Sequence, residues 1–537
     1  MTEFNEQEAK AISPFFSNLN KNVFVLKNLP EVVKGALFSR YSRSDKPLRK
    51  LLLDEFINDK NSLFNQLSLH EVVESQAIAT KKAEEFYDRI LIGYGDDSVA
   101  ELGGAHIACE NISNIAAKAI EDSRLGISPL EKSTRYVYFD KKVNGKYLYY
   151  LEPKIMNSKY ADEYISTCDS LFDSYSKLIN PMKKYLMEKF PKGEESERAY
   201  EASIKAKACD ILRGFLPAST LTNLGLYGNG RAFEYLIIKL ASSELTELNN
   251  IANEMYFELM NEIPSFVKRA KGVFGEQHSQ FLAESKKNLQ KFYDIELNGI
   301  PTPKSNEVTL ISYDEKALDK IVTASLYPFS ELPMQELKKA VALMPQEKKI
   351  EVLEKQLSKR QNRRHKPGRA FEYVYYEFDV LMNFASFRDL HRHRILTQQR
   401  QNLTVSHGFD TPNEIIEIGE EKNFKEQMHL AAETFYKLRK ELKNEAQYVV
   451  PFAYKTRFSI VANLRELYHL IELRSTIHGH PDYRRIVLKM LGEIKKIHPD
   501  LVKHMKFVDY RQASLERLEA EKRTDKKLEE LKRKYGD

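Results

Sequence analysis

The chain has 537 residues, too many for one small domain, and we expect two or three. A hydrophobic share of 42% suffices for packed cores, and a net charge of +6 argues against nucleic acid as the partner. Cys109, Cys168 and Cys209 lack the spacing of a disulfide scaffold or a structural zinc site. Apolar runs fall short of the roughly 20 residues of a membrane span. Residues 1–10 lack the layout of a signal peptide, so we expect a cytoplasmic protein.

Helical periodicity dominates the sequence, and strand-like stretches are short. Residues 296–308 are rich in glycine and proline and predict a linker near the middle of the chain. The highly charged residues 511–537 predict a helix that is solvated or lies on a neighbour. In chain order we also predict a strand at 146–153, a helix at 245–263, a strand at 308–314 and a helix at 463–478.

Two distant segments repeat one spacing of residues. Pro217 stands twelve residues before Asn229 in the first segment, and Pro451 stands twelve residues before Asn463 in the second. An arginine follows each asparagine by two residues. A glutamate that opens a largely apolar segment lies 116 residues before the first proline and 79 residues before the second. The shared spacing predicts a tandem duplication.

The duplication predicts an α+β fold: two tandem copies of a mostly helical domain with a small sheet, which together form a pseudo-dimer. We place the first copy at 1–298 and the second copy at 299–537, which ends in the charged helix. The first copy is the longer by 37 residues between its glutamate and its proline, and this predicts an insertion at about 137–200.

With these landmarks aligned, the sequence resembles a tandem duplication of the flavin-dependent thymidylate synthase family. The signature of that family is an Arg-His-Arg, then a Ser and an Arg-Tyr, all downstream of a Glu that opens a helix. The second copy retains the first half of this signature in Glu372, Arg392, His393 and Arg394. The first copy retains the second half in Glu131, Ser133, Arg135 and Tyr136.

Two further positions of the family are divided between the copies in the same way. Four residues before the proline, the family has an arginine for the nucleotide, which is Arg213 in the first copy but Gln447 in the second. Eleven residues after the asparagine, the family has an arginine that promotes ionisation of the uracil N3, which is Arg474 in the second copy but Leu240 in the first. In the family, two subunits build one active site. The resemblance therefore implies one composite site between the copies, with its symmetry mate abandoned.

The resemblance implies that dUMP is the substrate and dTMP the product, with methylenetetrahydrofolate as methyl donor and NADPH as reductant. A phosphate dianion suits the planar, permanently charged side chains of Arg135 and Arg213, and Ser133 can donate a further hydrogen bond. Arg474 is the candidate catalytic residue, because an arginine facing the pyrimidine favours the N3-deprotonated form. The implied substrate-binding residues also include Glu131, Arg392 and Asp389.

The resemblance also implies bound FAD, whose reduced form does the hydride work. If 463–478 is helical, Asn463 and Arg474 lie about 20° apart around the helix and about 16 Å apart along it, which suits a flavin at one end and a pyrimidine at the other. We expect a homodimer that rebuilds the tetramer of the family. The residues implied to contact FAD are Ser42, Glu372, Arg392, His393, Arg394, Asn463, Arg465 and His469.

Several alternatives stay open. The run His-Arg-His-Arg at 391–394 is, taken alone, typical of a solvated basic turn, and Arg474 could simply complement a helix C-terminus. We expect no metal, because neither a carboxylate nor a cysteine stands at ligand spacing from the histidines of 391–393 and 478–480. Asp389 occupies a position where the family usually has a Gln that contacts the pyrimidine. Another pyrimidine nucleotide, of the cytosine type, therefore remains possible, as does a catalytically silent nucleotide- or RNA-binding relative.

Overall fold

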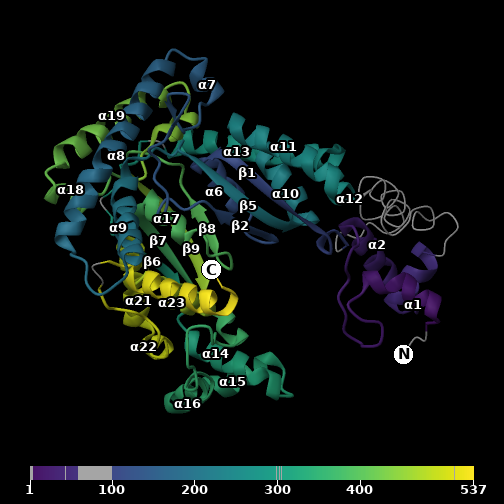
Figure 1. Ribbon diagram of the computed structural model, residues 1–537. Coiled ribbons are helices and arrows are strands. Elements are labelled where there is room, and N and C mark those ends of the chain that lie inside the picture. Colours follow the sequence, from purple (N-terminus) through teal and green to yellow (C-terminus); the bar gives the residue numbers. More distant parts are fainter. Residues whose placement is uncertain are drawn as a thin grey trace. The chain divides into compact units, whose positions relative to one another are not determined.

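The computed structural model describes residues 4–42, 44–57, 99–297, 299–301, 303, 305–512 and 515–536 (Figure 1). The chain divides into two compact units. Unit 1 comprises Met1–Ile112, Ala116–Lys132 and Thr222–Ile300, and unit 2 comprises Ser113–Ile115, Ser133–Leu221 and Pro301–Asp537. The segment 133–221 of the predicted first copy therefore belongs to the same unit as the predicted second copy. The limits of the copies themselves, 1–298 and 299–537, stay a prediction.

Unit 1 contains a three-stranded sheet in the order β1-β5-β2, formed by β1 (Gly104–Ser113), β5 (Leu221–Asn229) and β2 (Ile127–Glu131). Its helices and helical turns are α1 (Glu6–Ile12), η1 (Ser13–Phe15), α2 (Glu31–Tyr41), α3 (Leu48–Leu51), η2 (Leu52–Ile57), η4 (Val99–Glu101), α6 (Asn114–Glu121), α10 (Gly230–Ala241), α11 (Thr246–Glu262), α12 (Pro264–Val267), η6 (Lys268–Lys271) and α13 (Val273–Glu296).

Unit 2 contains a four-stranded antiparallel sheet in the order β6-β7-β9-β8, formed by β6 (Val308–Tyr313), β7 (Tyr375–Asn383), β9 (Lys455–Asn463) and β8 (Thr397–Arg400). A small hairpin joins β3 (Lys142–Val143) to β4 (Lys146–Tyr147). The helices and helical turns are α7 (Pro153–Met156), α8 (Ala161–Lys189), α9 (Glu197–Leu212), η5 (Arg213–Phe215), α14 (Ala317–Leu326), η7 (Tyr327–Phe329), α15 (Met334–Ala342), α16 (Gln346–Leu357), η8 (Arg369–Tyr373), α17 (Phe384–Leu390), α18 (Asn413–Glu417), α19 (Glu421–Arg439), η9 (Glu445–Val449), α20 (Leu464–Arg474), α21 (Pro481–Ile497), α22 (Pro499–Val502) and α23 (Leu518–Tyr535).

The two units share one arrangement of strands and helices. In each, a strand leads through a helix to a shorter strand, and both strands pair with a later strand that leads into another helix. The repeated asparagines begin these last helices. Asn229 caps α10 by accepting a hydrogen bond from the Ala232 N–H at 2.8 Å, and Asn463 caps α20 by accepting one from the Glu466 N–H at 2.9 Å. The expected α+β fold with two tandem copies is confirmed.

Within unit 2, the segments that carry the repeated prolines contact each other symmetrically. Pro217 and Pro451 form an antiparallel bridge. Two pairs of equivalent backbone hydrogen bonds surround it: Ala218 N–H to Val450 O (2.8 Å) matches Phe452 N–H to Leu216 O (2.9 Å), and Ser219 N–H to Tyr448 O (2.9 Å) matches Ala453 N–H to Gly214 O (3.1 Å). A local pseudo-two-fold axis therefore relates these parts of the two copies.

The long helices α8 and α19 also pack against each other in unit 2 (Figure 1). Their buried residues Thr167 and Thr434 share a hydrogen bond of 2.8 Å between the hydroxyl oxygens. Lys437 bonds Glu163 on one side of this contact, and Ser170 bonds Gln427 on the other, so the helices run antiparallel. Residues of the predicted insertion thus form part of the core of unit 2.

Some sequence expectations differ from the structure. Glu372 was expected to open a helix, but it lies in η8 and precedes the strand β7, in which Tyr376, Phe378, Val380 and Met382 alternate as buried residues. Glu377 and Asp379 stand between these buried residues, and this period of two is typical of a half-buried strand. The strand expected at 146–153 is reduced to the two residues of β4.

The remaining expected elements are present. The helix expected at 245–263 is α11, the strand expected at 308–314 is β6, and the helix expected at 463–478 is α20, which ends at Arg474. The charged C-terminal helix is α23, which lies on α9 through ion pairs of Arg198 with Glu521 and Asp525. Among the described residues, no helix has the length and apolar character needed to cross a membrane.

The contact between Thr167 and Thr434 gives a test of the packing. Replacing either threonine by valine leaves the other hydroxyl buried without its partner, and we expect each single variant to lose about 1–2 kcal/mol of unfolding free energy. The double variant Thr167→Val/Thr434→Val should lose less than the sum, because both polar groups are gone. Urea unfolding followed by circular dichroism measures these values. A double variant whose loss of unfolding free energy equals the sum of the two single losses would contradict the hydrogen bond between Thr167 and Thr434.

Candidate active site

The end of α9 presents a carboxylate to two buried arginines in unit 2. Arg135 donates from Nε and Nη2 to both carboxylate oxygens of Asp210, at 2.6–2.9 Å. Arg213, in the helical turn that follows α9, places its Nη1 3.6 Å from the same carboxylate. Burial acts to raise the pKa of Asp210, but the charges of Arg135 and Arg213 hold that pKa well below its ordinary value. Asp210 is therefore ionised and orients both guanidinium groups.

Arg213 retains hydrogen-bonding capacity inside the protein. Its side chain is buried, and within the part of the chain that the structure describes, its Nε and Nη2 have no hydrogen-bond partner. Arg213 also lines a cavity of about 380 Å³, whose other titratable lining residues are the bases Lys207, His480 and Arg485 and the acids Asp210, Asp410, Glu414, Asp482 and Glu516. Unsatisfied buried N–H groups of a guanidinium are costly, and an anionic ligand can satisfy them. The geometry therefore suits an anion-binding site at Arg213.

Asp389, near the end of α17, brings residues of both sequence copies together. Burial acts to raise the pKa of this carboxyl, but the charges of four arginines hold the pKa below its ordinary value. In decreasing order of effect these are Arg213, Arg135, Arg474 and Arg392. The arginines predicted to form one composite site are thus close enough to act on one carboxylate, and all of them lie in unit 2.

Arg474 is the last residue of α20 and connects this arginine cluster to a pair of histidines. Its Nε donates a hydrogen bond to Nε2 of His393 at 3.0 Å. Its guanidinium carbon lies 5.8 Å from the ring centre of Tyr483. Burial lowers the pKa of Arg474, and the charge of Asp389 opposes that shift. Arg474 is thus held by an imidazole on one side and by negative charge on another.

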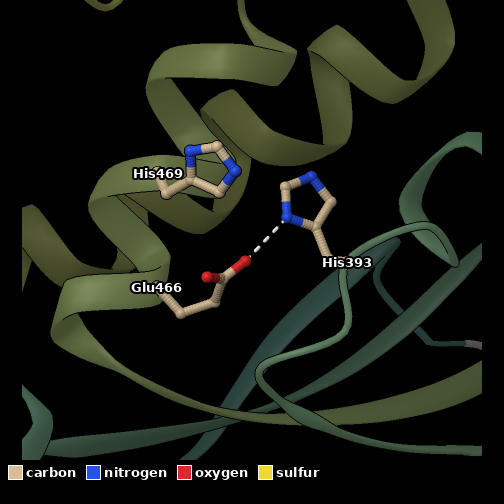
Figure 2. A group of neighbouring side chains, drawn as sticks. All are labelled: His393, Glu466 and His469. Carbon is tan, nitrogen blue, oxygen red and sulfur yellow. Dashed lines mark hydrogen bonds and ion pairs between the residues drawn. The ribbon is translucent and has the colours of Figure 1, made fainter. Parts of the chain in front are cut away.

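His393 forms a small cluster of titratable groups with Glu466 and His469, in which His393 and Glu466 are buried and His469 is partly exposed (Figure 2). Nδ1 of His393 and Oε1 of Glu466 are 2.7 Å apart. His469, one turn along α20 from Glu466, lies with its ring centre 5.4 Å from that of His393. Burial raises the pKa of Glu466 to about 7 against the opposing charges of His469 and nearby cations, and burial lowers the pKa of His469 to about 4.

This cluster corrects one sequence argument. We expected no carboxylate at metal-ligand spacing from the histidines, but one potential ligand atom from each of His393, Glu466 and His469 lies within 4.8 Å of the others. The sequence did not reveal the cluster because His393 and Glu466 are 73 residues apart. A carboxylate and two imidazoles are suitable ligands for a transition metal. The surrounding charge does not favour a cation, because Lys366, Arg465 and Arg474 all act on Glu466.

Other predicted FAD contacts form a separate interaction beside this cluster. Arg465 donates from Nη1 to Glu372 at 3.0 Å and from Nε to the Pro367 carbonyl at 2.8 Å. The side chain of Asn463 caps α20, as described above. Arg392 and Arg394, on the loop between α17 and β8, are exposed. Ser133 accepts a hydrogen bond from the Arg135 N–H at 3.2 Å, and this bond does not use the hydroxyl proton.

Two predicted site residues belong to unit 1. Glu131 is buried, and its side chain accepts a hydrogen bond from Lys118 at 2.9 Å, while Lys118 also bonds Glu121. Ser42 is exposed at the end of α2, and its hydroxyl donates to the Ser39 carbonyl at 2.8 Å. Their assignment to substrate and FAD stays a prediction.

Sequence reasoning missed Asp210, Glu466 and Tyr483. The first two stand three residues from a recognised landmark, Asp210 before Arg213 and Glu466 after Asn463. A spacing of three residues places side chains on neighbouring positions of a helix, and this signal was available. Tyr483 had no comparable signal, because the turn between α20 and α21 brings it to Arg474.

Comparison with known proteins agrees with this arrangement. Residues 59–265 and 309–500 match the family described as thymidylate synthase complementing protein, and the chain belongs to this family. It is 44% identical to a UPF0159 protein of Chlamydia muridarum over 527 residues, which cover 97% of this chain and 98% of the relative. It is 36% identical to a UPF0159 protein of Thermoplasma acidophilum over 520 residues, 92% of this chain and 99% of the relative. A Saccharolobus solfataricus protein named flavin-dependent thymidylate synthase is 32% identical over 146 residues, 25% of this chain and 54% of that protein.

The buried pair of Arg135 and Asp210 gives a stability test. Asp210→Asn leaves two buried guanidinium groups without their shared negative charge, so we expect a loss of about 3 kcal/mol of unfolding free energy at pH 7. Because the folded-state pKa of Asp210 is depressed, its contribution is present above the unfolded pKa. The difference from wild type should therefore shrink as the pH falls below about 4.

A surface ion pair provides the control for Asp210→Asn. Asp525→Asn removes an ion pair between α23 and Arg198 and should cost under about 1 kcal/mol. Guanidinium unfolding at several pH values measures both variants. A stable Asp210→Asn protein, or a loss that does not depend on pH, would contradict the assigned role of this carboxylate.

Proposed function

We propose that this protein is a flavin-dependent thymidylate synthase-like enzyme. It would convert dUMP to dTMP with methylenetetrahydrofolate as methyl donor, FAD as cofactor and NADPH as reductant. One observation carries the proposal: arginines from both sequence copies act on the single carboxylate of Asp389 within one compact unit. The family of the chain, and relatives named flavin-dependent thymidylate synthase, support the same reaction class.

In this proposal, Arg213 and Arg135 bind the phosphate of the nucleotide. Arg213 supplies two buried N–H groups that have no partner within the described part of the chain. Arg135 is already oriented by Asp210 and adds charge. Ser133 would donate a hydrogen bond from its hydroxyl group to the same phosphate. A guanidinium binds two oxygens of a phosphate through parallel hydrogen bonds, so this set favours a dianion over a neutral ligand.

Arg474 faces the pyrimidine in the proposed complex and stabilises negative charge on the base. Arg474 is partly buried, so its charge acts more strongly than it would in bulk solvent. Uracil becomes nucleophilic at C5 when N3 is deprotonated, and a guanidinium near N3 favours that form by charge pairing. Arg392 also acts on Asp389. We propose that Arg392 contacts both the nucleotide and the flavin.

The residues around His469 suit FAD by the chemistry of their donors. Arg392 and Arg394 present exposed guanidinium groups, and the charges of Lys366 and Arg363 act on His469. Such a set of cations suits a pyrophosphate, while Asn463, Arg465 and Glu372 would hold other polar atoms of the cofactor. FAD, when bound, would supply hydride transfer. The protein would orient the ligands and exclude water.

Asp389 supports a second candidate, an enzyme of the same class that modifies a cytosine-type nucleotide. The arginine charges keep Asp389 ionised, so its carboxylate can only accept hydrogen bonds. An exocyclic amino group is the natural donor to such a carboxylate, whereas an N3-deprotonated uracil repels it. The proposal also includes a homodimer as the assembled form and the cytoplasm as its location.

An absorbance spectrum and a tritium-release assay of the purified protein test the proposal. We expect a yellow protein with the absorbance of FAD, and release of tritium from C5-labelled dUMP in the presence of methylenetetrahydrofolate and NADPH. Arg213→Met should weaken dUMP binding about 100-fold, because the phosphate loses a buried charged donor. Arg439→Met, which changes an exposed arginine of α19, should bind dUMP as wild type does.

The other outcomes separate the alternatives. Tritium release from labelled dCMP and none from dUMP would support the cytosine-type candidate. A colourless protein that binds polyanions only at low salt would contradict both enzymes and indicate a silent nucleotide- or RNA-binding relative. Growth of a thymidine auxotroph on the wild-type gene without thymidine would support the dUMP reaction in the cell.

A further inference from the structure

We propose that Glu466 and His393 are positioning residues that fix the orientation of Arg474 through a continuous hydrogen-bonded relay. The inference rests on the proposed function for the role of Arg474, but the relay itself is a property of this chain alone. Its members come from two elements of unit 2: Glu466 and Arg474 from the two ends of α20, and His393 from the loop after α17.

The chemistry of the donors fixes the direction of the relay. A guanidinium can only donate hydrogen bonds, so the Arg474 Nε–H requires His393 Nε2 to accept at 3.0 Å. A neutral imidazole carries its proton on the other nitrogen, so Nδ1–H donates to Glu466 at 2.7 Å. Burial and the charge of Arg474 hold the pKa of His393 well below its ordinary value, which agrees with a neutral ring.

The helix alone cannot make this connection. Glu466 and Arg474 are eight residues apart, so their backbones are separated by about 12 Å along α20. His393 therefore bridges two groups that do not reach each other. Glu466 is itself fixed at its backbone, because the Asn463 side chain accepts a hydrogen bond from its N–H. The sequence landmark Asn463 thus anchors the first member of the relay, and Arg474 is the last.

The hydrogen bonds of His393 suit the relay better than they suit a metal ligand. A metal bound at Nδ1 of His393 would force the ring proton onto Nε2, where it would oppose the Arg474 N–H. Arg474 and Lys366 act on both His393 and Glu466, and Arg465 acts on Glu466. These positive charges stabilise a carboxylate and repel a cation. The observed bonds use both ring nitrogens of His393 without an ion.

Loss of the carboxylate would release Arg474. Without an acceptor at Nδ1, His393 is free to carry its proton on Nε2, and two donors then face each other. Protonation of Glu466, whose pKa is raised to about 7, weakens the same bond, because a neutral carboxyl is a weaker acceptor than a carboxylate. The titratable and charged groups that face Glu466 are His393, His469, Arg465, Arg474 and Lys366. The relay is therefore strongest above this pKa and weakens as the pH falls through it.

Nitrogen-15 NMR of protein with labelled histidine tests the relay without any assay of activity. The His393 signals are identified by their loss in His393→Gln. At pH 8 we expect the Nδ1–H tautomer in wild type, and a change of these signals with a midpoint near pH 7. Glu466→Gln keeps a neutral acceptor that does not titrate, so it should lose the midpoint near pH 7 and retain the Nδ1–H tautomer. Glu466→Leu should lose it, whereas His469→Gln should keep it.

Kinetics then test the positioning role. Glu466→Leu should lower kcat on the order of 100-fold with a small change in KM for the nucleotide, because a displaced Arg474 misaligns the reaction more than it weakens binding. Glu466→Gln should rescue most of that activity and abolish the loss of rate on the acid side. Thermal unfolding of each variant shows whether the fold is retained.

The outcomes distinguish this inference from the proposed function. An Nε2–H tautomer of His393 in wild type, or an unchanged tautomer in Glu466→Leu, would overturn the relay. An active wild type with full kcat in Glu466→Leu would overturn the positioning role and leave the proposed function standing. A wild type that shows the predicted tautomer but no turnover of either nucleotide would contradict the proposed function and leave the relay intact.

Discussion

Burial of several guanidinium groups against few carboxylates is the constraint on which the site in unit 2 depends. Asp210 is bonded to Arg135 and lies close to Arg213, and Asp389 serves the same two arginines together with Arg474 and Arg392. Buried charges are tolerated only when they are paired or bonded. Of the four arginines that act on Asp389, Arg135 and Arg213 are buried. In the proposed function, a phosphate dianion adds negative charge beside these two guanidinium groups.

Duplication explains how this cluster arose without symmetry. The bridge between Pro217 and Pro451 and its matched hydrogen bonds preserve a local pseudo-two-fold axis in unit 2. The polar side chains did not keep that symmetry. In unit 1, the segment from α6 to β2 contains buried Lys118 bonded to both Glu121 and Glu131. A cluster with two carboxylates around one ammonium group does not favour an anion.

The sequence predicted the backbone landmarks better than the electrostatic partners. The spacing from proline to asparagine located the Pro217–Pro451 bridge and the two helix caps. These residues set the local backbone conformation, and both copies of the duplication retain them. Asp210 and Glu466 were missed because each partners an arginine or histidine that is distant in sequence. The strand β7 has a period of two, in which Glu377 and Asp379 separate buried residues, and this signal was available in the sequence. Long-range pairing of charges is set by the fold, and a residue pattern alone does not reveal it.

The number of nucleotides bound per chain tests the central claim most directly, because two diverged copies that share one set of arginines form one site and not two. Titration calorimetry of the purified protein with dUMP gives this number and the affinity together. We predict one nucleotide per 537-residue chain, with binding weakened when either Arg213 of the first copy or Arg474 of the second is replaced. Two nucleotides per chain, or binding that both replacements leave unchanged, would contradict the account.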